Sequence, residues 1–559
     1  MNFFAFPKRT LAALLVLLAV AAYLPAIGAG YVWDDDTLLT ANPQMRGAAG
    51  LVEIWEGVRS RDYTPVTLTV FWLEWRLWGD TPVGYHVVNI LLHALSALLL
   101  WRILERLRVP GAWLGALLFA IHPVNAASVA WVAELKNTLS GALFFGSALT
   151  FLEAREGRRT YGLSLALFLL AALSKGAVVT LPAALLLCVL WLDGKLTRRD
   201  GIRLAGYCAI ALLAALVTIR FQARAPHYGL IPDTLAYRIA RAGAAVWFYL
   251  GALIWPVGLS PIRAQWLPDL RSPGAWLPAA GAAALGILFY LKRAGWGRPL
   301  LFGYAYFLAM LLPVLGFVWM TLMQETPVAD WWQYLAAPGI FAVAGAGIAL
   351  AARRWRMVTP VVCVAMALLM VQTWRRASIY HSMASYCLAV TAEDPHAWTL
   401  QNNLGILLKR AGRFAEAEQC FRRALRDNPG YAEAHINMGN AYGASGDIPS
   451  ALAEYRTAAE MRPGDPQVAA ALASLGGALI GAGNYASAEA CFRQACVQEP
   501  ESIALRIGLC QALLPQGKKE EALRVCGEVD RIAKASGNAI ALAAAEKLRG
   551  DCNSAAGNR

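Results

Sequence analysis

The sequence has few charged residues, and its cysteines lack the spacing of a metal site. Charged residues make up 16% of the 559 residues and hydrophobic ones 58%, with a mean hydropathy of +0.45. This balance excludes an ordinary soluble globular protein for most of the chain. None of the ten cysteines forms a CxxC pair, so no zinc site is expected.

Long apolar runs are absent after Trp374, although they recur from Leu11 up to that point. A helix that spans a bilayer needs about 20 mostly apolar residues, because its backbone must satisfy its own hydrogen bonds in hydrocarbon. The sequence therefore predicts a polytopic membrane domain at residues 1–376, a connector at 377–395 and a different domain at 396–559.

The formal charge of +13 is spread over short basic clusters that lie between apolar runs. The first of these clusters are Arg102/Arg106/Arg108, Arg155/Arg158/Arg159 and Lys195/Arg198/Arg199. Cytoplasmic loops of membrane proteins carry an excess of Lys and Arg. We therefore attribute the charge to membrane topology, and we expect a lipid bilayer as partner and no nucleic acid.

The first expected span follows Lys8 and Arg9 and has no A-x-A cleavage site at its end, which favours an uncleaved helix with a cytoplasmic N-terminus. Further spans are expected at 84–104, 112–124, 138–152, 161–173, 177–192, 202–219, 278–291, 300–319, 333–350 and 357–374. The first outer loop then covers residues 29–83.

Residues 237–259 form one more apolar segment, and the number of spans depends on it. Counted as an ordinary span, it places the following basic clusters outside, against the positive-inside rule. We therefore expect it to enter the membrane and return on the outer side, with Trp255-Pro256 breaking the helix. About eleven spans then leave the C-terminal domain outside, and twelve spans are the alternative.

From His396 onward the sequence changes to pairs of short amphipathic helices. Gly405, Gly439 and Gly476 lie 34 and 37 residues apart. The aromatics Phe421, Tyr455 and Phe492 repeat in step with them. This pattern is typical of tetratricopeptide repeats, in which small residues allow close helix contact and aromatics fill the remaining gap. We expect an α-solenoid that binds a protein or peptide.

The first outer loop opens with three acids in the run Tyr31-Val32-Trp33-Asp34-Asp35-Asp36. Carboxylates at a membrane surface can deprotonate or position a hydroxyl group, and they can hold a divalent cation beside a phosphate. An acidic triplet can equally cap a helix in a solvated loop. Asp34, Asp35 and Asp36 are therefore candidate catalytic residues, with both interpretations open.

Other titratable residues are expected at the same outer face. The second outer connection contains His122, Glu134 and Lys136. A basic group follows at Lys175, Arg220, Arg224, His227 and Arg238. Such side chains beside apolar grooves can bind the phosphate of a lipid through charge-assisted hydrogen bonds. Snorkelling toward headgroups is the alternative interpretation.

An ordered series of motifs adds a family resemblance. It comprises the Tyr31 to Asp36 run with Asn42-Pro43, Gly84-Tyr85-His86, His122-Pro123-Val124, Ser174-Lys175, Trp255-Pro256 and the C-terminal repeats. Over nearly its whole length the sequence resembles the transmembrane and tetratricopeptide-repeat O-mannosyltransferase-like proteins of the C-type glycosyltransferase superfamily. The resemblance implies an all-α fold, with a polytopic helix bundle of the C-type glycosyltransferase kind followed by a tetratricopeptide-repeat α-solenoid.

The resemblance also implies a polyprenyl-phosphate sugar as donor, chemistry on the non-cytoplasmic side and a catalytic acidic pair at Asp34 and Asp35. The sequence departs from the family pattern at Ala127, Leu135 and Asn137, where many relatives have charged residues. The expected catalytic role therefore centres on the Asp34 to Asp36 cluster. The supporting residues are His86, His122, Glu134 and Lys136.

Together these features predict an inverting glycosyltransferase that moves a monosaccharide to a Ser or Thr hydroxyl of a protein acceptor. No cofactor is required, although a divalent cation is possible. We expect a bacterial plasma membrane, with the repeats on its periplasmic or extracellular side. The alternatives are a membrane-anchored tetratricopeptide scaffold for envelope assembly and a lipid-linked glycan ligase or transporter.

Overall fold

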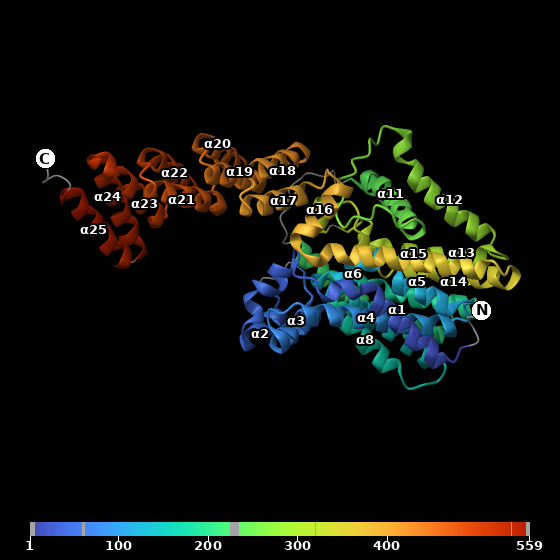
Figure 1. Cartoon of the computed structure of the whole chain (residues 1–559). Coiled ribbons are helices and arrows are strands. Elements are labelled where there is room, and N and C mark those ends of the chain that lie inside the picture. Colours follow the sequence, from blue (N-terminus) through green and yellow to red (C-terminus); the bar gives the residue numbers. More distant parts are fainter. Residues whose placement is uncertain (1–5, 59–61, 224–233, 319, 538, 555–559) are drawn as a thin grey trace. The chain divides into compact units, whose positions relative to one another are not determined.

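The computed structural model describes residues 6–58, 62–223, 234–318, 320–537 and 539–554. All regular elements in these ranges are helical, and no strand occurs in them. Contacts divide the chain into two units, Met1–Asp394 and Pro395–Arg559. Figure 1 shows both units as assemblies of helices. The predicted all-α fold class is confirmed.

The first unit is a bundle of apolar helices. Its longer helices are α1 (Lys8–Ile27), α4 (Val83–Arg106), α7 (Leu135–Arg155), α10 (Arg198–Gln222), α11 (Leu235–Ile254), α14 (Ala337–Arg354) and α15 (Val358–Ser378). Its shorter helices are α2 (Ala48–Glu56), α3 (Pro65–Trp78), α5 (Ala112–Ile121), α6 (Ala126–Ala130), α8 (Tyr161–Ser174), α9 (Leu181–Asp193), α12 (Leu277–Leu291), α13 (Gly297–Leu311) and α16 (Met383–Glu393).

These helices are those of a multi-pass membrane protein. Among the described residues, six helical segments are long and apolar enough to cross a bilayer, or up to seven if the bent α5–α6 pair is one span. Several of them expose most of their apolar surface, as α10 and α15 do, which suits contact with lipid. The arrangement of about eleven spans stays a prediction.

The bend between α5 and α6 is 50°, and it falls at His122-Pro123. Proline has no N–H to continue a helix, and the next donor, the Val124 N–H, bonds to Nδ1 of His122 at 3.3 Å. The Val124 N–H at the bend therefore has a local hydrogen-bond partner. It carries the short helix α6 and the following turn to the end of the bundle where the first connecting segment lies.

The basic clusters lie together at one end of the bundle. Ion pairs join them to one another: Lys8–Glu105 at 2.9 Å, Arg106–Glu153 at 2.7 Å and Arg155–Asp200 at 2.9 Å. Arg298, at the start of α13, donates to the Trp191 carbonyl at the end of α9 (2.8 Å). We call this end of the first unit the basic end.

The helix α11 ends at Ile254, immediately before Trp255-Pro256, as the sequence predicted. Proline disfavours a helical conformation at the residue before it. The chain then runs back toward the start of α11, because the Tyr237 hydroxyl donates to the Trp266 carbonyl at 2.7 Å. Helix α11 and the non-helical segment after it therefore begin and end on the same side of the bundle.

The neighbouring helices show at which end of the bundle this part of the chain begins and ends. Helices α12 and α13 pair closely, with the Tyr304 hydroxyl on the Ala282 carbonyl at 2.9 Å, and a short turn joins them. Because α13 begins at the basic end, α12 begins at the opposite end. Helix α10 also ends there, since Gln222 accepts from the Thr321 N–H in the α13–α14 connection (3.3 Å). The end of α10 and the start of α12 therefore lie at the same end of the bundle.

The second unit consists of helix pairs. They are α17 (Trp398–Arg410) with α18 (Phe414–Asp427), α19 (Ala432–Ser445) with α20 (Ile448–Met461), α21 (Pro466–Gly481) with α22 (Tyr485–Gln498), and α23 (Ile503–Leu513) with α24 (Lys519–Ser536), followed by α25 (Ala539–Ser554). Within the first three pairs, a Cβ added at Gly405, Gly439 or Gly476 would lie only 2.6–2.7 Å from the ring of Phe421, Tyr455 or Phe492. Only glycine permits this approach of the two helices.

Candidate active site

The first connecting segment between α1 and α4 covers the end of the bundle opposite the basic end. It contains α2, α3 and two short turns. Its apolar side chains, including Leu39, Ile54 and Phe71, pack against Tyr85 of α4 and against Val132 after α6. This packing fixes the position of the acidic run at the start of the segment.

Asp35 is buried, with 1% of its surface exposed. Its two carboxylate oxygens accept from the Val32 N–H and the Ala133 N–H, both at 2.7 Å. Burial raises the pKa of Asp35 to about 8, against the lowering effect of these two hydrogen bonds. Asp35 thus ties the first segment to the turn before α7, and both oxygens are occupied.

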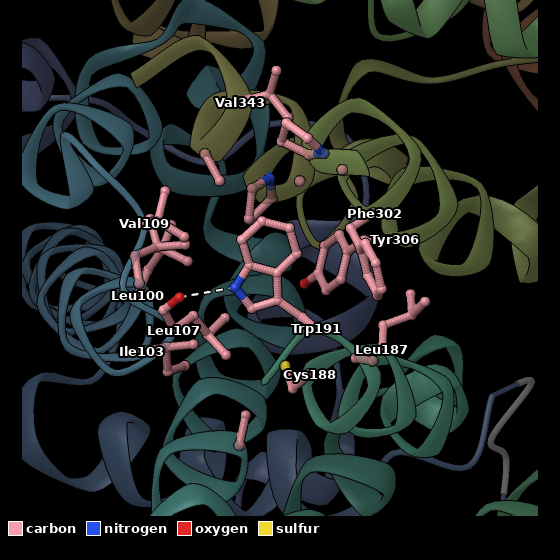
Figure 2. A pocket seen from close by; sticks show the side chains of 18 of the residues that line it. Leu100, Ile103, Leu107, Val109, Leu187, Cys188, Trp191, Phe302, Tyr306 and Val343 are labelled. Carbon is pink, nitrogen blue, oxygen red and sulfur yellow. Dashed lines mark hydrogen bonds between the residues drawn. The ribbon is translucent and has the colours of Figure 1, made fainter. Parts of the chain in front are cut away.

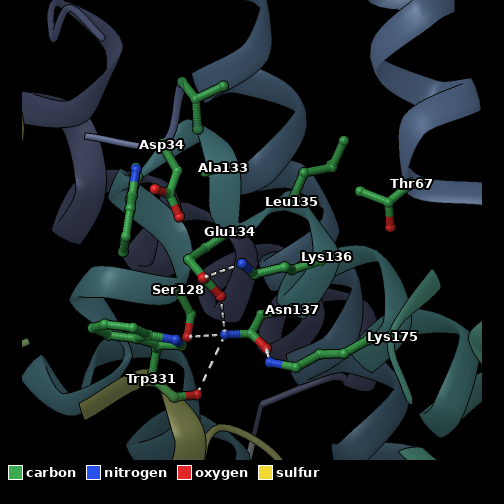
Figure 3. Close-up of polar contacts among 12 residues, drawn as sticks. Asp34, Thr67, Ser128, Ala133, Glu134, Leu135, Lys136, Asn137, Lys175 and Trp331 are labelled. Carbon is green, nitrogen blue, oxygen red and sulfur yellow. Dashed lines mark hydrogen bonds and ion pairs between the residues drawn. The ribbon is translucent and has the colours of Figure 1, made fainter. Parts of the chain in front are cut away.

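Asp34 and Asp36 lie on either side of this buried carboxylate. Asp36 is exposed and accepts from the Thr40 hydroxyl at 3.0 Å, as a residue in the first turn of a helix does. Asp34 is half-buried, and its charge acts on the ammonium group of Lys136. Figure 3 shows Asp34 beside Glu134 and Lys136. The three acids therefore have three different environments.

A polar network lies next to Asp34 at the start of α7 (Figure 3). The side chain of Glu134 is fully buried and forms an ion pair with Lys136 at 3.0 Å. The Asn137 amide donates to Glu134 at 2.5 Å, to the Ser128 hydroxyl at 3.0 Å and to the Trp331 carbonyl at 3.3 Å. Asn137 therefore joins α6, α7 and the α13–α14 connection.

Lys175 completes the network from the break between α8 and the next helical turn. Its ammonium group donates to the Asn137 carbonyl oxygen, which is uncharged. No carboxylate among the described residues lies within ion-pair distance of it. Burial lowers the pKa of Lys175 to about 8. A cation whose direct partner is neutral is suited to bind an anion.

The chemistry available here is a carboxylate, Asp34, whose charge acts on the ammonium group of Lys136, with a second ammonium group, Lys175, joined to the same network through Asn137. Asp34 can accept a proton from a hydroxyl group. Lys136 and Lys175 can stabilise negative charge that develops on a phosphate. Among the described residues, no group of three or more His, Cys, Asp or Glu side chains is arranged to hold a metal ion.

The histidines expected to support the site do not join this network. His86 is buried in α4 beside the backbone of Ala29, Gly30 and Ala130. His122 bonds to the Val124 N–H and packs against the Phe341 ring, with centroids 5.0 Å apart. His122 thus holds the turn at Pro123 in place, whereas neither ring nitrogen of His86 has a hydrogen-bond partner among the described residues.

The structure brings only part of the expected basic group to the site. Arg220 is exposed at the end of α10, which lies beside Lys175 because Thr218 touches Gly176. Arg238 donates to the Phe317 carbonyl at 2.6 Å. Arg224 and His227 lie outside the described residues.

Sequence reasoning missed the central position of Asn137 and the contribution of Trp331. It treated Asn137 only as a departure from the family pattern. The spacing of Glu134 and Asn137 places them on neighbouring positions of one helical turn, which was a usable signal. The contact of the Trp331 carbonyl with Asn137 could not be predicted from a local sequence pattern, because a long-range backbone contact depends on how the bundle packs.

Comparison with known proteins identifies the relatives of the chain. A family model described as tetratricopeptide repeat matches residues 408–475 and 479–546. Protein O-mannosyl-transferase Tmtc1 of Drosophila melanogaster is 26% identical over 550 residues, which covers 75% of this chain and 62% of the relative. The predicted resemblance is confirmed. The chain is similar to O-mannosyl-transferases of the TMTC type and carries tetratricopeptide repeats.

Other relatives match over shorter regions. Protein O-mannosyl-transferase F38B6.6 of Caenorhabditis elegans is 28% identical, covering 37% of this chain and 31% of the relative. Protein O-mannosyl-transferase Tmtc2 of Drosophila melanogaster is 31% identical, covering 34% and 23%. The matched regions thus amount to less than two thirds of each of these relatives.

Solved structures match in part of the chain. A crystal structure of MamA is 16% identical with a TM-score of 0.24, covering 28% of this chain and 84% of that protein. A structure of the tetratricopeptide protein YrrB is 19% identical with a TM-score of 0.22, covering 30% and 88%.

Proposed function

We propose that the chain is a membrane glycosyltransferase that transfers a monosaccharide from a polyprenyl-phosphate donor to a Ser or Thr hydroxyl of a protein. The observation that carries the proposal is the network of Asp34, Glu134, Lys136, Asn137 and Lys175. It combines a proton acceptor with two cations at one end of a membrane helix bundle. Because the relatives are named protein O-mannosyl-transferases, mannose is the first sugar to test.

In the proposed reaction, the Asp34 carboxylate accepts the proton of the acceptor hydroxyl as its oxygen attacks the anomeric carbon. The bond from that carbon to the phosphate oxygen breaks, and polyprenyl phosphate leaves from the opposite face, which inverts the anomeric centre. Lys175 and Lys136 stabilise the charge that returns to the phosphate. Asp35 holds the loop in place, and Glu134 orients Lys136 and Asn137.

The proposed sidedness rests on the ends of the bundle. The basic clusters gather at one end and the polar network lies at the other. Under the positive-inside rule the network then faces away from the cytoplasm. The repeats, which we place on the same periplasmic or extracellular side of a bacterial plasma membrane, would bind the polypeptide acceptor.

The test compares two neighbouring acids in the purified full chain with labelled polyprenyl-phosphate mannose and an acceptor protein. Asp34→Asn removes the proton acceptor, so we expect transfer to fall by about 10²-fold or more. Asp36→Asn is the matched control, because Asp36 is exposed and bonds only within its own turn, and it should stay within a few-fold of wild type. Undiminished transfer by Asp34→Asn would reject Asp34 as the proton acceptor, whereas absence of transfer by wild type would favour the scaffold alternative.

Lys175 gives a second test, which addresses the proposed contact with the donor phosphate. In Lys175→Gln the side chain can still reach Asn137 but carries no charge. We expect the donor KM to rise by roughly tenfold, as for the loss of one charge-assisted hydrogen bond. Exposed Arg220→Gln is the comparison variant. A KM for the donor that Lys175→Gln leaves unchanged would contradict the assigned phosphate contact.

A further inference from the structure

An apolar pocket lies between five helices of the first unit. Its volume is about 160 Å³, and residues of α4, α7, α9, α13 and α14 line it. Figure 2 shows Trp191, Phe302 and Tyr306 around the hollow, with Leu100 and Val109 on another side. The lining side chains are aliphatic and aromatic, apart from the thiol of Cys188.

The size and lining of the pocket restrict what can fill it. An apolar cavity of about 150 Å³ stays free of water and accepts a ligand of the size of benzene. A pocket of about 160 Å³ with an almost wholly apolar lining is therefore better suited to a segment of hydrocarbon than to water or a whole lipid. Within a membrane, acyl chains supply such segments.

The pocket is separate from the polar network. Both lie along α7, where Asn137 belongs to the network and Phe144 is the first residue that lines the pocket. These residues are seven positions apart, which corresponds to about 10 Å along an α-helix. The pocket therefore lies nearer to the basic end than the proposed site of transfer does.

Trp191 forms the rim of the pocket at that end. Its indole N–H donates to the Leu107 carbonyl after α4 at 2.8 Å. Its own carbonyl accepts from Arg298 of α13 at 2.8 Å, and this guanidinium lies 5.1 Å from the centre of the Trp191 ring. A tryptophan beside an arginine is typical of the membrane–water interface.

Two arginines at this rim carry charge that nothing in the described chain neutralises. Arg108 lies between the lining residues Leu107 and Val109, and Arg298 precedes the lining residue Pro299. Both are exposed, and neither forms an ion pair among the described residues. Neighbouring arginines do: Arg106 pairs with Glu153 and Glu156, and Arg155 with Asp193 and Asp200. The rim thus has excess positive charge beside an apolar hollow.

We propose that this pocket binds one acyl chain of an anionic glycerophospholipid, whose phosphate is held by Arg298 and Arg108. The apolar lining accounts for the chain, and the two unneutralised arginines account for the headgroup charge. The lipid comes from the leaflet at the basic end, so it is not the sugar donor of the proposed reaction.

Native mass spectrometry of the purified full chain tests this site. Phosphatidylglycerol and phosphatidylcholine with identical acyl chains are titrated separately. We expect wild type to prefer phosphatidylglycerol by about fivefold for each arginine, and the double variant Arg108→Gln/Arg298→Gln to lose this preference. Arg353→Gln, an exposed basic residue after the last lining position of α14, should keep it.

A second variant tests the chain pocket itself. Ala346→Phe places a ring in the hollow, so it should weaken binding of both phospholipids while Arg353→Gln does not. Equal binding of the two lipids by wild type, or an unchanged preference in the double arginine variant, would overturn the proposal. Displacement of phosphatidylglycerol by polyprenyl phosphate would also overturn it, because the pocket would then belong to the donor. None of these readouts depends on transferase activity.

Discussion

At the scale of single residues, Glu74 is the most unusual carboxyl group outside the polar network. It lies in α3 of the first connecting segment, 3% exposed, and neither of its oxygens has a hydrogen-bond partner among the described residues. Burial raises its pKa from the usual 4.5 to about 8. Tyr31 and Tyr85 are the titratable groups that interact with it.

This raised pKa predicts a pH-dependent stability. The folded chain binds the Glu74 proton more tightly than the unfolded chain, so stability is lost as pH rises from about 4.5 toward 8. Glu74→Gln removes the titrating group. We expect the variant to gain stability over wild type by roughly 1.4 kcal/mol per pH unit across this window, with little difference near pH 4.5. The measurement is thermal unfolding in detergent between pH 5 and pH 9.

The control for this prediction is Glu56→Gln, because Glu56 lies in the same segment and is exposed. Its melting curve should follow that of wild type at every pH. If the curves of Glu74→Gln and wild type also stay parallel, the folded chain does not hold a proton at this position.

The acidic triplet shows how far single residues could be predicted. The sequence identified Asp34, Asp35 and Asp36 as one cluster, but three adjacent aspartates cannot be distinguished by composition. Their environments differ because the Ala133 N–H, almost a hundred residues away, bonds to Asp35 alone. The role of each acid depends on this long-range contact, and the sequence does not contain it in any local pattern.

At the scale of elements, the repeat unit depends on contacts between glycine and an aromatic ring. In α21, a Cβ at Gly476 would lie 2.7 Å from the Phe492 ring, whereas a Cβ at the adjacent Gly477 meets nothing within 4 Å. Gly476→Ala should destabilise the second unit by about 1–3 kcal/mol through overpacking. Gly477→Ala should instead stabilise it by up to about 1 kcal/mol, because alanine favours a helix.

These neighbouring substitutions form a matched pair, since both add one methyl group to the same helix. Limited proteolysis of the second unit and thermal unfolding of the full chain would measure the difference. Equal effects of the two variants would show that the Gly476–Phe492 contact does not limit the approach of α21 and α22.

Elements with a strong local signal were the ones that the sequence predicted well. The helix break at Trp255-Pro256 and the glycine–aromatic register of the repeats follow from backbone chemistry that acts over a few residues. The bend between α5 and α6 was not predicted, although His122-Pro123 causes it. One span was expected at 112–124, because the apolar composition continues through the bend.

At the scale of the whole molecule, the number of membrane crossings determines which parts of the chain share a compartment. The apolar segment 237–259 was the uncertain step, because a single crossing there would reverse every later loop. The contacts of Gln222 with Thr321, and of Tyr304 with Ala282, return this segment to the end where it left. They support the proposed arrangement of about eleven spans, with the polar network and the repeats outside.

This sidedness predicts a pattern of labelling by a membrane-impermeant thiol reagent in intact cells. Single cysteines at exposed positions serve as probes: Glu56→Cys in the first connecting segment, Arg413→Cys in the repeats, and Gly295→Cys and Arg356→Cys at the basic end. We expect the first two to react from outside. The last two should react only after the membrane is permeabilised, because basic loops face the cytoplasm.

All ten native cysteines are replaced by alanine in the parent chain, among them the exposed Cys208 and Cys363 within α10 and α15. That parent is the control, and it should not be labelled before permeabilisation. Labelling of Gly295→Cys from outside would add a crossing in 223–276. Protection of Arg413→Cys would place the repeats in the cytoplasm. The repeats could not then present an acceptor to Asp34, and the role proposed for them would be wrong.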